Sequence, residues 1–275
     1  MDPALSRLRG CVVLNFFKKL FTSAHQEAVV VPQQILNPRV PDGVRVYVVG
    51  DIHGRLDLLN QIHEQIAAEV SELPKSQKKI VVYLGDYIDR GEESFGVVDL
   101  LINRPLTGCE SVFLKGNHEM EMESFLESPR PNHVWAQYGG IATALSYQVR
   151  VKAQISAMDR MRSLRDQMVE MLPAEHQAFF ANLQIFFEIG DYFMVHAGVR
   201  PGVPLLLQNP VEMLWIRDPF LNHTGPFEKR IVHGHTVTPQ PITLPNRIGI
   251  DTGAYHSGRL TCLVLEGEES RFLTT

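Results

Sequence analysis

The sequence predicts an α/β fold, and three observations support this prediction. A strand-like segment followed by a helix-like segment occurs three times in the first half, at about 30-residue spacing, which is typical of parallel βαβ units. Each of these strands ends in a polar cluster flanked by glycine. The second half favours strands. The 275 residues are enough to bury a sizeable core.

The three strand–helix repeats follow one another from Val44 onwards. Residues 44–49 are an almost unbroken apolar run, which indicates a buried strand. The next segment repeats apolar residues with a helical period, and the alternation then starts again. The predicted strands cover residues 44–49, 79–84 and 111–114, and the predicted helices cover residues 55–70, 94–101 and 119–126.

The later part of the chain begins with helix and then turns to strand. Residues 154–182 are predicted to be helical, and the methionines that recur there are interpreted as core packing. Gly190–Asp191 separates two apolar segments and therefore predicts a β-hairpin. The predicted strands of this part cover residues 184–188, 192–195, 230–233, 247–250 and 260–265.

Residues 1–43 are expected to form a leader, partly helical or flexible, ahead of a domain that covers residues 44–275. Prolines at 32, 38 and 41 predict a loose connection there. The apolar stretch from Cys11 to Phe17 is short and no small-residue cleavage site follows it, which argues against a signal peptide. A helix packed on the domain, a mobile leader or an amphipathic helix on a membrane surface are the alternatives.

Composition excludes several classes of protein. The formal net charge of −5 gives no sign of a nucleic-acid binder. No apolar run approaches the roughly 18 residues that span a bilayer, so no stable membrane insertion is expected. Cys11, Cys109 and Cys262 are odd in number and far apart, which predicts reduced thiols in a cytoplasmic protein.

Five glycine-bracketed clusters follow predicted strands. Ligands bind just beyond the carboxyl ends of strands in open parallel sheets, so the first three clusters are expected to converge on one site. Aspartate, asparagine and histidine without cysteine suit a divalent metal such as manganese, iron or zinc. The clusters are Gly50–Gly54, Gly85–Gly91, Gly116–Glu119, Val195–Gly198 and His233–Thr236.

These clusters resemble the signature of the PPP-family serine/threonine protein phosphatases, within the calcineurin-like metallophosphoesterase superfamily. That signature reads GDxHG, GDxxDRG, GNHE, HAG or HGG, and a late GH, and its elements occur here in order. Residues 250–254 and 258–261 resemble the bacterial and phage branch. The resemblance covers residues 44–266 and implies a central two-sheet β-sandwich of mixed sheets, flanked by helices.

The resemblance also implies a dinuclear metal site. Its ligands are Asp51 and His53 for the first ion, Asp86 bridging both ions, and Asn117, His196 and His235 for the second. Two divalent ions are expected, with Mn²⁺ favoured and iron or zinc as alternatives. A metal-bridging hydroxide would then attack phosphorus directly, without a phosphoenzyme.

Other site residues take roles from the same resemblance. His118 is the expected general acid that protonates the leaving alkoxide, and Asp89 would orient and charge its imidazole. Arg90 and Asn117 are expected to bind the phosphate.

A second phosphate-binding arginine is also expected. Arg217 is the candidate, and Arg55 is a weaker one. Glu119 is expected to support the metal ligands without binding a metal itself.

The expected activity is that of a metal-dependent serine/threonine protein phosphatase, which hydrolyses phosphate monoesters in phosphorylated proteins or peptides. Phosphotyrosine is a further possible substrate. The alternatives are a symmetrical dinucleoside polyphosphate hydrolase, acting on diadenosine tetraphosphate, and a catalytically inactive binding module. A helical cap at about residues 130–183 would shape the substrate cleft. The eukaryotic C-terminal pattern is absent, so no eukaryotic-type regulatory subunit is inferred.

Overall fold

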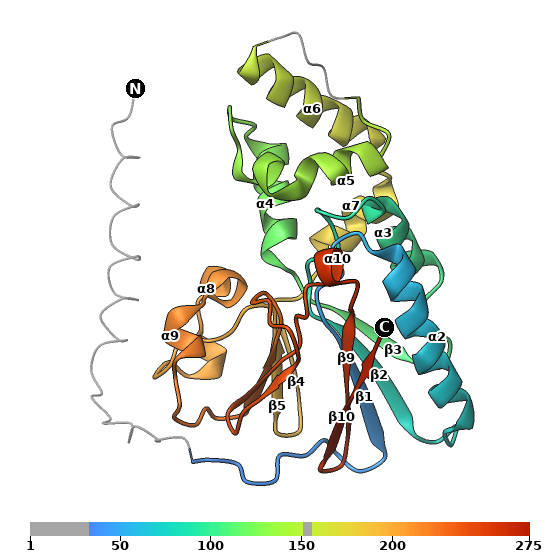
Figure 1. Cartoon of the computed structure of the whole chain (residues 1–275), viewed down its shortest axis with the longest axis vertical. Helices are drawn as coiled ribbons and strands as arrows, with labels where there is room; N and C mark the ends of the chain where they lie inside the picture. Colours follow the sequence, from blue (N-terminus) through green and yellow to red (C-terminus); the bar gives the residue numbers. More distant parts are fainter. Residues whose placement is uncertain (1–32, 151–155) are drawn as a thin grey trace, which may run out of the picture. The chain divides into compact units, whose positions relative to one another are not determined.

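Two five-stranded β-sheets form the centre of the protein (Figure 1). The computed structural model describes residues 33–150 and 156–275. The strand order is β10-β9-β1-β2-β3 in the first sheet and β4-β5-β6-β8-β7 in the second. The first sheet contains β1 (Val44–Val49), β2 (Lys78–Tyr83), β3 (Glu110–Phe113), β9 (Thr261–Glu266) and β10 (Glu269–Thr274). The second contains β4 (Phe186–Ile189), β5 (Tyr192–Val195), β6 (Arg230–His233), β7 (Ile242–Thr243) and β8 (Arg247–Gly249).

The strand–helix repeats predicted for the first half are confirmed. β1 pairs with β2 and β2 pairs with β3, in both cases parallel. The connecting helices are α2 (Leu56–Glu72), α3 (Ser94–Asn103) and α4 (Asn117–Glu127). α4 begins at Asn117, ahead of the predicted start at Glu119, so the third polar cluster forms the first turn of a helix.

Alternation along β1 explains how the layers pack. Val46 and Val48 point into a core between the two sheets, where they join residues such as Met194 and Val232 of the second sheet. Tyr47 and the other outward residues of β1 pack against α2 and α3 instead. A fully buried valine contributes roughly 1.5–3 kcal/mol relative to an exposed one, so both faces of β1 stabilise the sandwich. The expected two-sheet architecture with outer helices is therefore confirmed.

The helical part differs in detail from the prediction. In place of one helix over residues 154–182, the structure has α6 (Ala157–Met171) and α7 (Ala174–Ala181), separated at Pro173. Proline favours the start of a helix because it lacks the backbone N–H that an interior position would need. Met161 and Met168 are buried in the core, which confirms the predicted packing role for these two, whereas Met158 is half-buried and Met171 is exposed. A π-helical turn (Ala136–Gly140) and α5 (Ile141–Ser146) precede them.

The second half contains the predicted hairpin and several elements that were not predicted. β4 and β5 pair antiparallel across Gly190, as expected. β10 was missed because it is a polar edge strand whose residues are mostly exposed. The short elements η2 (Leu205–Leu207), α8 (Pro210–Trp215), α9 (Asp218–Leu221) and α10 (Ala254–Ser257) were also not predicted.

The segment ahead of β1 packs on the domain. Residues 33–43 belong to the same compact unit as the rest of the described chain, although the sequence placed the start of the domain at Val44. Val40 is fully buried, and its backbone N–H donates to the carbonyl of Gly267 at 3.0 Å. The expected leader helix and Cys11 lie outside the described residues. Among the helices of residues 33–150 and 156–275, none combines the length and apolarity needed to cross a bilayer.

His63 on α2 provides a test of how burial controls stability. Its Nε2 lies 2.8 Å from the Tyr83 hydroxyl, and burial lowers the pKa of His63 to about 4. The unfolded chain takes up this proton near pH 6.5, so the fold loses stability as the pH falls from 6.5 towards 4. In His63→Gln we expect the free energy of unfolding to fall less steeply with decreasing pH, by up to about 1.4 kcal/mol per pH unit. Denaturant unfolding of both proteins between pH 6.5 and pH 4 measures this difference. Identical slopes of unfolding free energy against pH in the two proteins would contradict the prediction.

Candidate active site

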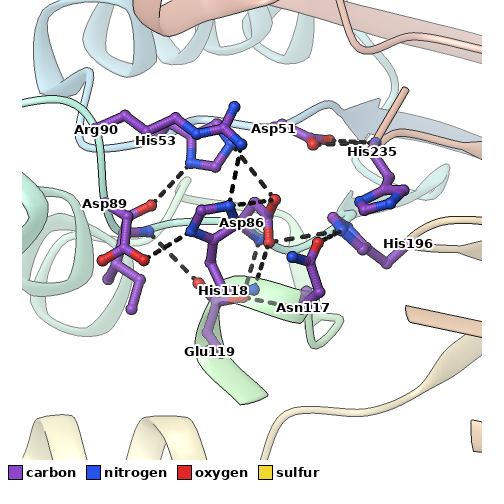
Figure 2. Close-up of polar contacts among 12 residues, drawn as sticks. Asp51, His53, Asp86, Asp89, Arg90, Asn117, His118, Glu119, His196 and His235 are labelled. Atoms are coloured by element: carbon purple, nitrogen blue, oxygen red, sulfur yellow. Dashed lines mark hydrogen bonds and ion pairs between the residues drawn. The ribbon is translucent and has the colours of Figure 1, made fainter. Parts of the chain in front are cut away.

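The loops that follow the central strands bring the predicted site residues together (Figure 2). Asp51 and His53 follow β1, Asp86 follows β2, and Asn117 opens α4. The second sheet adds residues that follow β5 and β6. All six predicted metal ligands are at least nine-tenths buried: Asp51, His53, Asp86, Asn117, His196 and His235.

Asp86 lies at the centre of this group. His53 Nε2 is 3.4 Å from its Oδ2, and His196 Nε2 is 3.5 Å from its Oδ1. Burial alone would raise the pKa of Asp86, but the surrounding histidines, led by His196 and His118, hold it well below its usual range. Asp86 is therefore a carboxylate that can serve two clusters of ligand atoms, one with His53 and His118 and one with His196 and His235.

Backbone contacts orient the histidines towards the centre. His53 Nδ1 lies 2.9 Å from the carbonyl oxygen of Ile88, and His196 Nδ1 lies 2.9 Å from that of Leu84. An N–H donated to a carbonyl leaves the other ring nitrogen unprotonated and free to bind a metal. Burial lowers the pKa of His53 to about 3, so its imidazole is neutral near pH 7.

His235 gives the clearest indication that a cation belongs here. Its Nε2 is buried and has no hydrogen-bond partner among the residues that the structure describes. Burial lowers the pKa of His235 to about 2, so the imidazole is neutral, and in the tautomer protonated at Nδ1 this Nε2 is an acceptor. An orphaned acceptor inside the domain costs free energy unless a ligand satisfies it. The oxygen and nitrogen donors around it fit divalent transition metals.

Asp51 forms the other end of the cluster. It accepts the backbone N–H of His235 at 3.0 Å, and a side chain on Gly234 would place Cβ 2.0 Å from its Oδ1. Only glycine therefore allows this contact. Burial, followed by the charges of Asp251 and Asp86, raises the pKa of Asp51 well above its usual value. Such crowding of carboxylates favours a bound cation.

Asp251 was not among the residues predicted for the site. It follows β8, is 3% exposed, and accepts the backbone N–H of Gly253 at 2.9 Å. Burial raises its pKa to about 6. The signal that could have identified it is its position after a strand of the second sheet, between Gly249 and Gly253, which resembles the glycine-bracketed pattern of the other clusters.

Glu119 supports the site through the backbone. Its carboxylate accepts N–H groups from Asp86 at 2.9 Å, Tyr87 at 2.8 Å and Gly116 at 2.9 Å. These bonds join the second polar cluster to the third. The contact requires a tight turn, since Asp86 has a φ of 51°, in the left-handed region that disfavours most side chains. Glu119 thus holds the central carboxylate in place without facing the cavity.

His118 and Asp89 form the predicted pair. His118 Nδ1 is 2.7 Å from Asp89 Oδ2, and both side chains are buried. Burial lowers the pKa of His118, but Asp86 and Asp89 together raise it above its usual value. Arg90 Nη2 lies 3.2 Å from His118 Nε2, a contact in which Arg90 donates and which holds only while the imidazole is neutral, because the charged imidazole carries a proton on Nε2. A phosphate that attracts Arg90 would free Nε2 to face the leaving group.

An open cavity of about 460 Å³ adjoins the cluster. Arg217 lines it and donates to Thr236 Oγ1 at 3.3 Å. Arg55, the weaker candidate, is bound to Asp57 and to the carbonyl of Ala254 instead. The lining includes Arg90, Asn117, His118, Glu121, Val134, Trp135, Tyr138, Trp215, Arg217 and His235.

His233 does not join the cluster. Its Nε2 accepts from the guanidinium of Arg247 at 3.1 Å, and its Nδ1 lies 3.1 Å from the carbonyl oxygen of Gly234. Both ring nitrogens are therefore occupied away from Asp86. The structure places His235, rather than His233, with the ligand atoms.

Comparison with known proteins agrees with this geometry. The family model described as calcineurin-like phosphoesterase matches residues 44–264, which is most of the chain. The chain belongs to the calcineurin-like phosphoesterase family. The recognised resemblance to metallophosphoesterases is thereby confirmed.

Individual relatives of this phosphoesterase divide between two kinds of name. Serine/threonine-protein phosphatase 2 of Escherichia coli is 30% identical, covering 78% of this chain and 90% of that protein. The asymmetrical bis(5'-nucleosyl)-tetraphosphatase PrpE of Oceanobacillus iheyensis is 21% identical, covering 79% and 87%. A mutant of a cold-active protein tyrosine phosphatase has a similar fold, with a TM-score of 0.53, 15% identity and coverage of 86% and 83%.

Proposed function

We propose that this phosphoesterase is a metal-dependent protein phosphatase that hydrolyses phosphoserine and phosphothreonine in phosphorylated proteins or peptides. The observation that carries the proposal is the buried His118–Asp89 pair, 2.7 Å apart, at a cavity that Arg90 and Arg217 also line. A proton donor and two guanidinium groups at one cavity match the needs of phosphate monoester cleavage. The 30% identity to a bacterial serine/threonine-protein phosphatase supports it.

The buried cluster would hold two divalent ions. One ion would be bound by Asp51, His53 and Asp86. The other would be bound by Asp86, Asn117, His196 and His235. Oxygen and imidazole nitrogen donors without thiolate suit manganese, iron or zinc, and of these we favour Mn²⁺. When bound, such ions lower the pKa of water and offset the charge on the phosphoryl oxygens.

The chain's own residues bind and orient the substrate. Arg90 and Arg217 would bind the phosphoryl oxygens, with the Asn117 amide beside them. Hydroxide, formed when water releases a proton to solvent, attacks phosphorus while the bond from phosphorus to the ester oxygen breaks. His118 gives its Nε2 proton to that oxygen, and Asp89 keeps the imidazole oriented through Nδ1. The proposal needs no phosphoenzyme, because the nucleophile comes from water.

A second candidate is hydrolysis of a dinucleoside polyphosphate. It is favoured by the PrpE relatives, which are named asymmetrical bis(5'-nucleosyl)-tetraphosphatases. The alternative inferred from the sequence is the symmetrical reaction. The symmetrical and asymmetrical reactions give different products. Symmetrical cleavage of diadenosine tetraphosphate yields two molecules of ADP, whereas asymmetrical cleavage yields ATP and AMP.

A side-by-side assay separates the candidates. Purified protein with added Mn²⁺ is given matched phosphoserine, phosphothreonine and phosphotyrosine peptides and, separately, diadenosine tetraphosphate. We expect a higher kcat/KM for the phosphoserine or phosphothreonine peptides, with release of inorganic phosphate. A clear preference for the dinucleotide would contradict the proposal. No turnover of p-nitrophenyl phosphate with metal bound would instead favour an inactive binding module.

A further inference from the structure

The carboxylate of Asp89 is held from the side opposite His118. Its Oδ2 faces His118 Nδ1 at 2.7 Å, while its Oδ1 accepts the indole N–H of Trp135 at 3.0 Å and the hydroxyl of Thr143 at 2.6 Å. Asp89 is fully buried. These three donors satisfy a charge that would otherwise be costly to bury. Both added donors come from the helical cap, which lies 46 and 54 residues away in sequence.

The same part of the cap also holds the backbone of the second polar cluster. Asp89 and Arg90 have φ values of 73° and 67°, a conformation that costs free energy for residues with a side chain. The N–H of Asp89 donates to Thr143 Oγ1 at 2.8 Å and to Ser94 Oγ at 3.1 Å. The N–H of Arg90 donates to the carbonyl of Gly139 at 3.4 Å. A Cβ on Gly139 would lie 2.5 Å from that nitrogen, so the approach requires glycine.

The other side of this segment faces the substrate cavity. Val134, Trp135 and Tyr138 line the cavity together with Arg90 and His118. The Trp135 ring also packs on Phe125 of α4, with ring centroids 4.7 Å apart. One stretch of the cap therefore forms a wall of the cleft and holds the partner of the general acid.

We propose that Trp135 and Thr143 are positioning residues that fix Asp89 so that His118 presents Nε2 to the leaving oxygen. The inference rests on the proposed function of His118. With both donors on Oδ1, rotation of the carboxylate would break two hydrogen bonds, so Oδ2 stays on His118. Without them, the imidazole loses a fixed partner, and proton donation to the leaving group becomes inefficient.

The test compares leaving groups. Trp135→Phe keeps an aromatic ring against Phe125 but removes the N–H, and Thr143→Val removes the hydroxyl at nearly constant shape. Phenyl phosphate needs protonation of its leaving oxygen, whereas p-nitrophenolate leaves readily without it. We expect kcat for phenyl phosphate to fall by about 10–100-fold in each variant, as for loss of a hydrogen bond to a charged group. The fall for p-nitrophenyl phosphate should be much smaller, with metal content and KM little changed.

Matched variants separate positioning from simple damage to the cap. Thr143→Ser should restore the wild-type ratio of the two substrates, and Gln137→Ala, an exposed cap residue that bonds Asn132, should leave it unchanged. Equal loss on both substrates, or no rescue by Thr143→Ser, would overturn the inference while the phosphatase proposal stands. An inactive wild-type protein with metal bound would overturn the proposed function itself.

Discussion

Replacement of His118 by asparagine is expected to lower kcat by about 10²–10⁴-fold, the usual contribution of a general acid. Asparagine keeps a polar side chain of moderate size at this position but cannot deliver a proton at neutral pH. The loss should be largest for alkyl phosphates such as phosphoserine, whose leaving oxygen most needs protonation. KM should change little, because Arg90 and Arg217 remain to bind the phosphate.

The metal content of His118→Asn decides between two roles for this residue. His118 Nε2 lies 3.9 Å from Asp86 Oδ2, close enough that the imidazole could be a ligand instead of an acid. We expect elemental analysis to find the same metal content as in the wild type. His223→Asn, which changes a histidine outside the site, is the control. Loss of an ion from His118→Asn would assign the imidazole to the metal and remove the acid from the account.

Replacement of Asp86 by asparagine is expected to have a still larger effect. Among the residues that the structure describes, Asp86 is the carboxylate that both groups of candidate ligand atoms share, with His53 and His118 on one side and His196 and His235 on the other. Its negative charge would also stabilise the two cations inside the buried cluster. We therefore expect the affinity for both ions to fall by more than about 100-fold, which exceeds the effect of removing a residue that only hydrogen-bonds to a metal ligand. Turnover should fall to background.

Titration of the metal-free protein with Mn²⁺ by calorimetry measures this effect. Asp57→Asn is the matched control, since Asp57 is paired with Arg55 outside the cluster. It should bind two ions with wild-type affinity. If Asp86→Asn also bound two ions with unchanged affinity, Asp86 would not be the shared ligand.

Local sequence patterns could predict the scaffold of the site because each polar cluster directly follows its strand. The strands β1 and β2 each end in a continuous run of buried apolar residues, and Asp51 and Asp86 follow these strand ends by two and three residues. Parallel pairing then brings these positions to one edge of the sheet. The convergence of the first three clusters therefore required no knowledge of distant contacts.

The features that the sequence did not reveal depend on contacts between distant segments. Trp135 and Thr143 reach Asp89 from the helical cap, and nothing near them in sequence marks that contact. Asp251 joins the cluster only because the second sheet packs against the first. β10 is a polar edge strand without alternating apolar residues, so periodicity could not show it.

Diffraction from crystals grown with Mn²⁺, with data collected at the manganese absorption edge, would locate the bound ions. We expect two anomalous peaks about 3.5–4 Å apart, with Asp86 between them. One peak should contact Asp51 and His53, and the other should contact Asn117, His196 and His235. Protein that is catalytically active in Mn²⁺ yet shows no anomalous peak within this cluster would contradict the account.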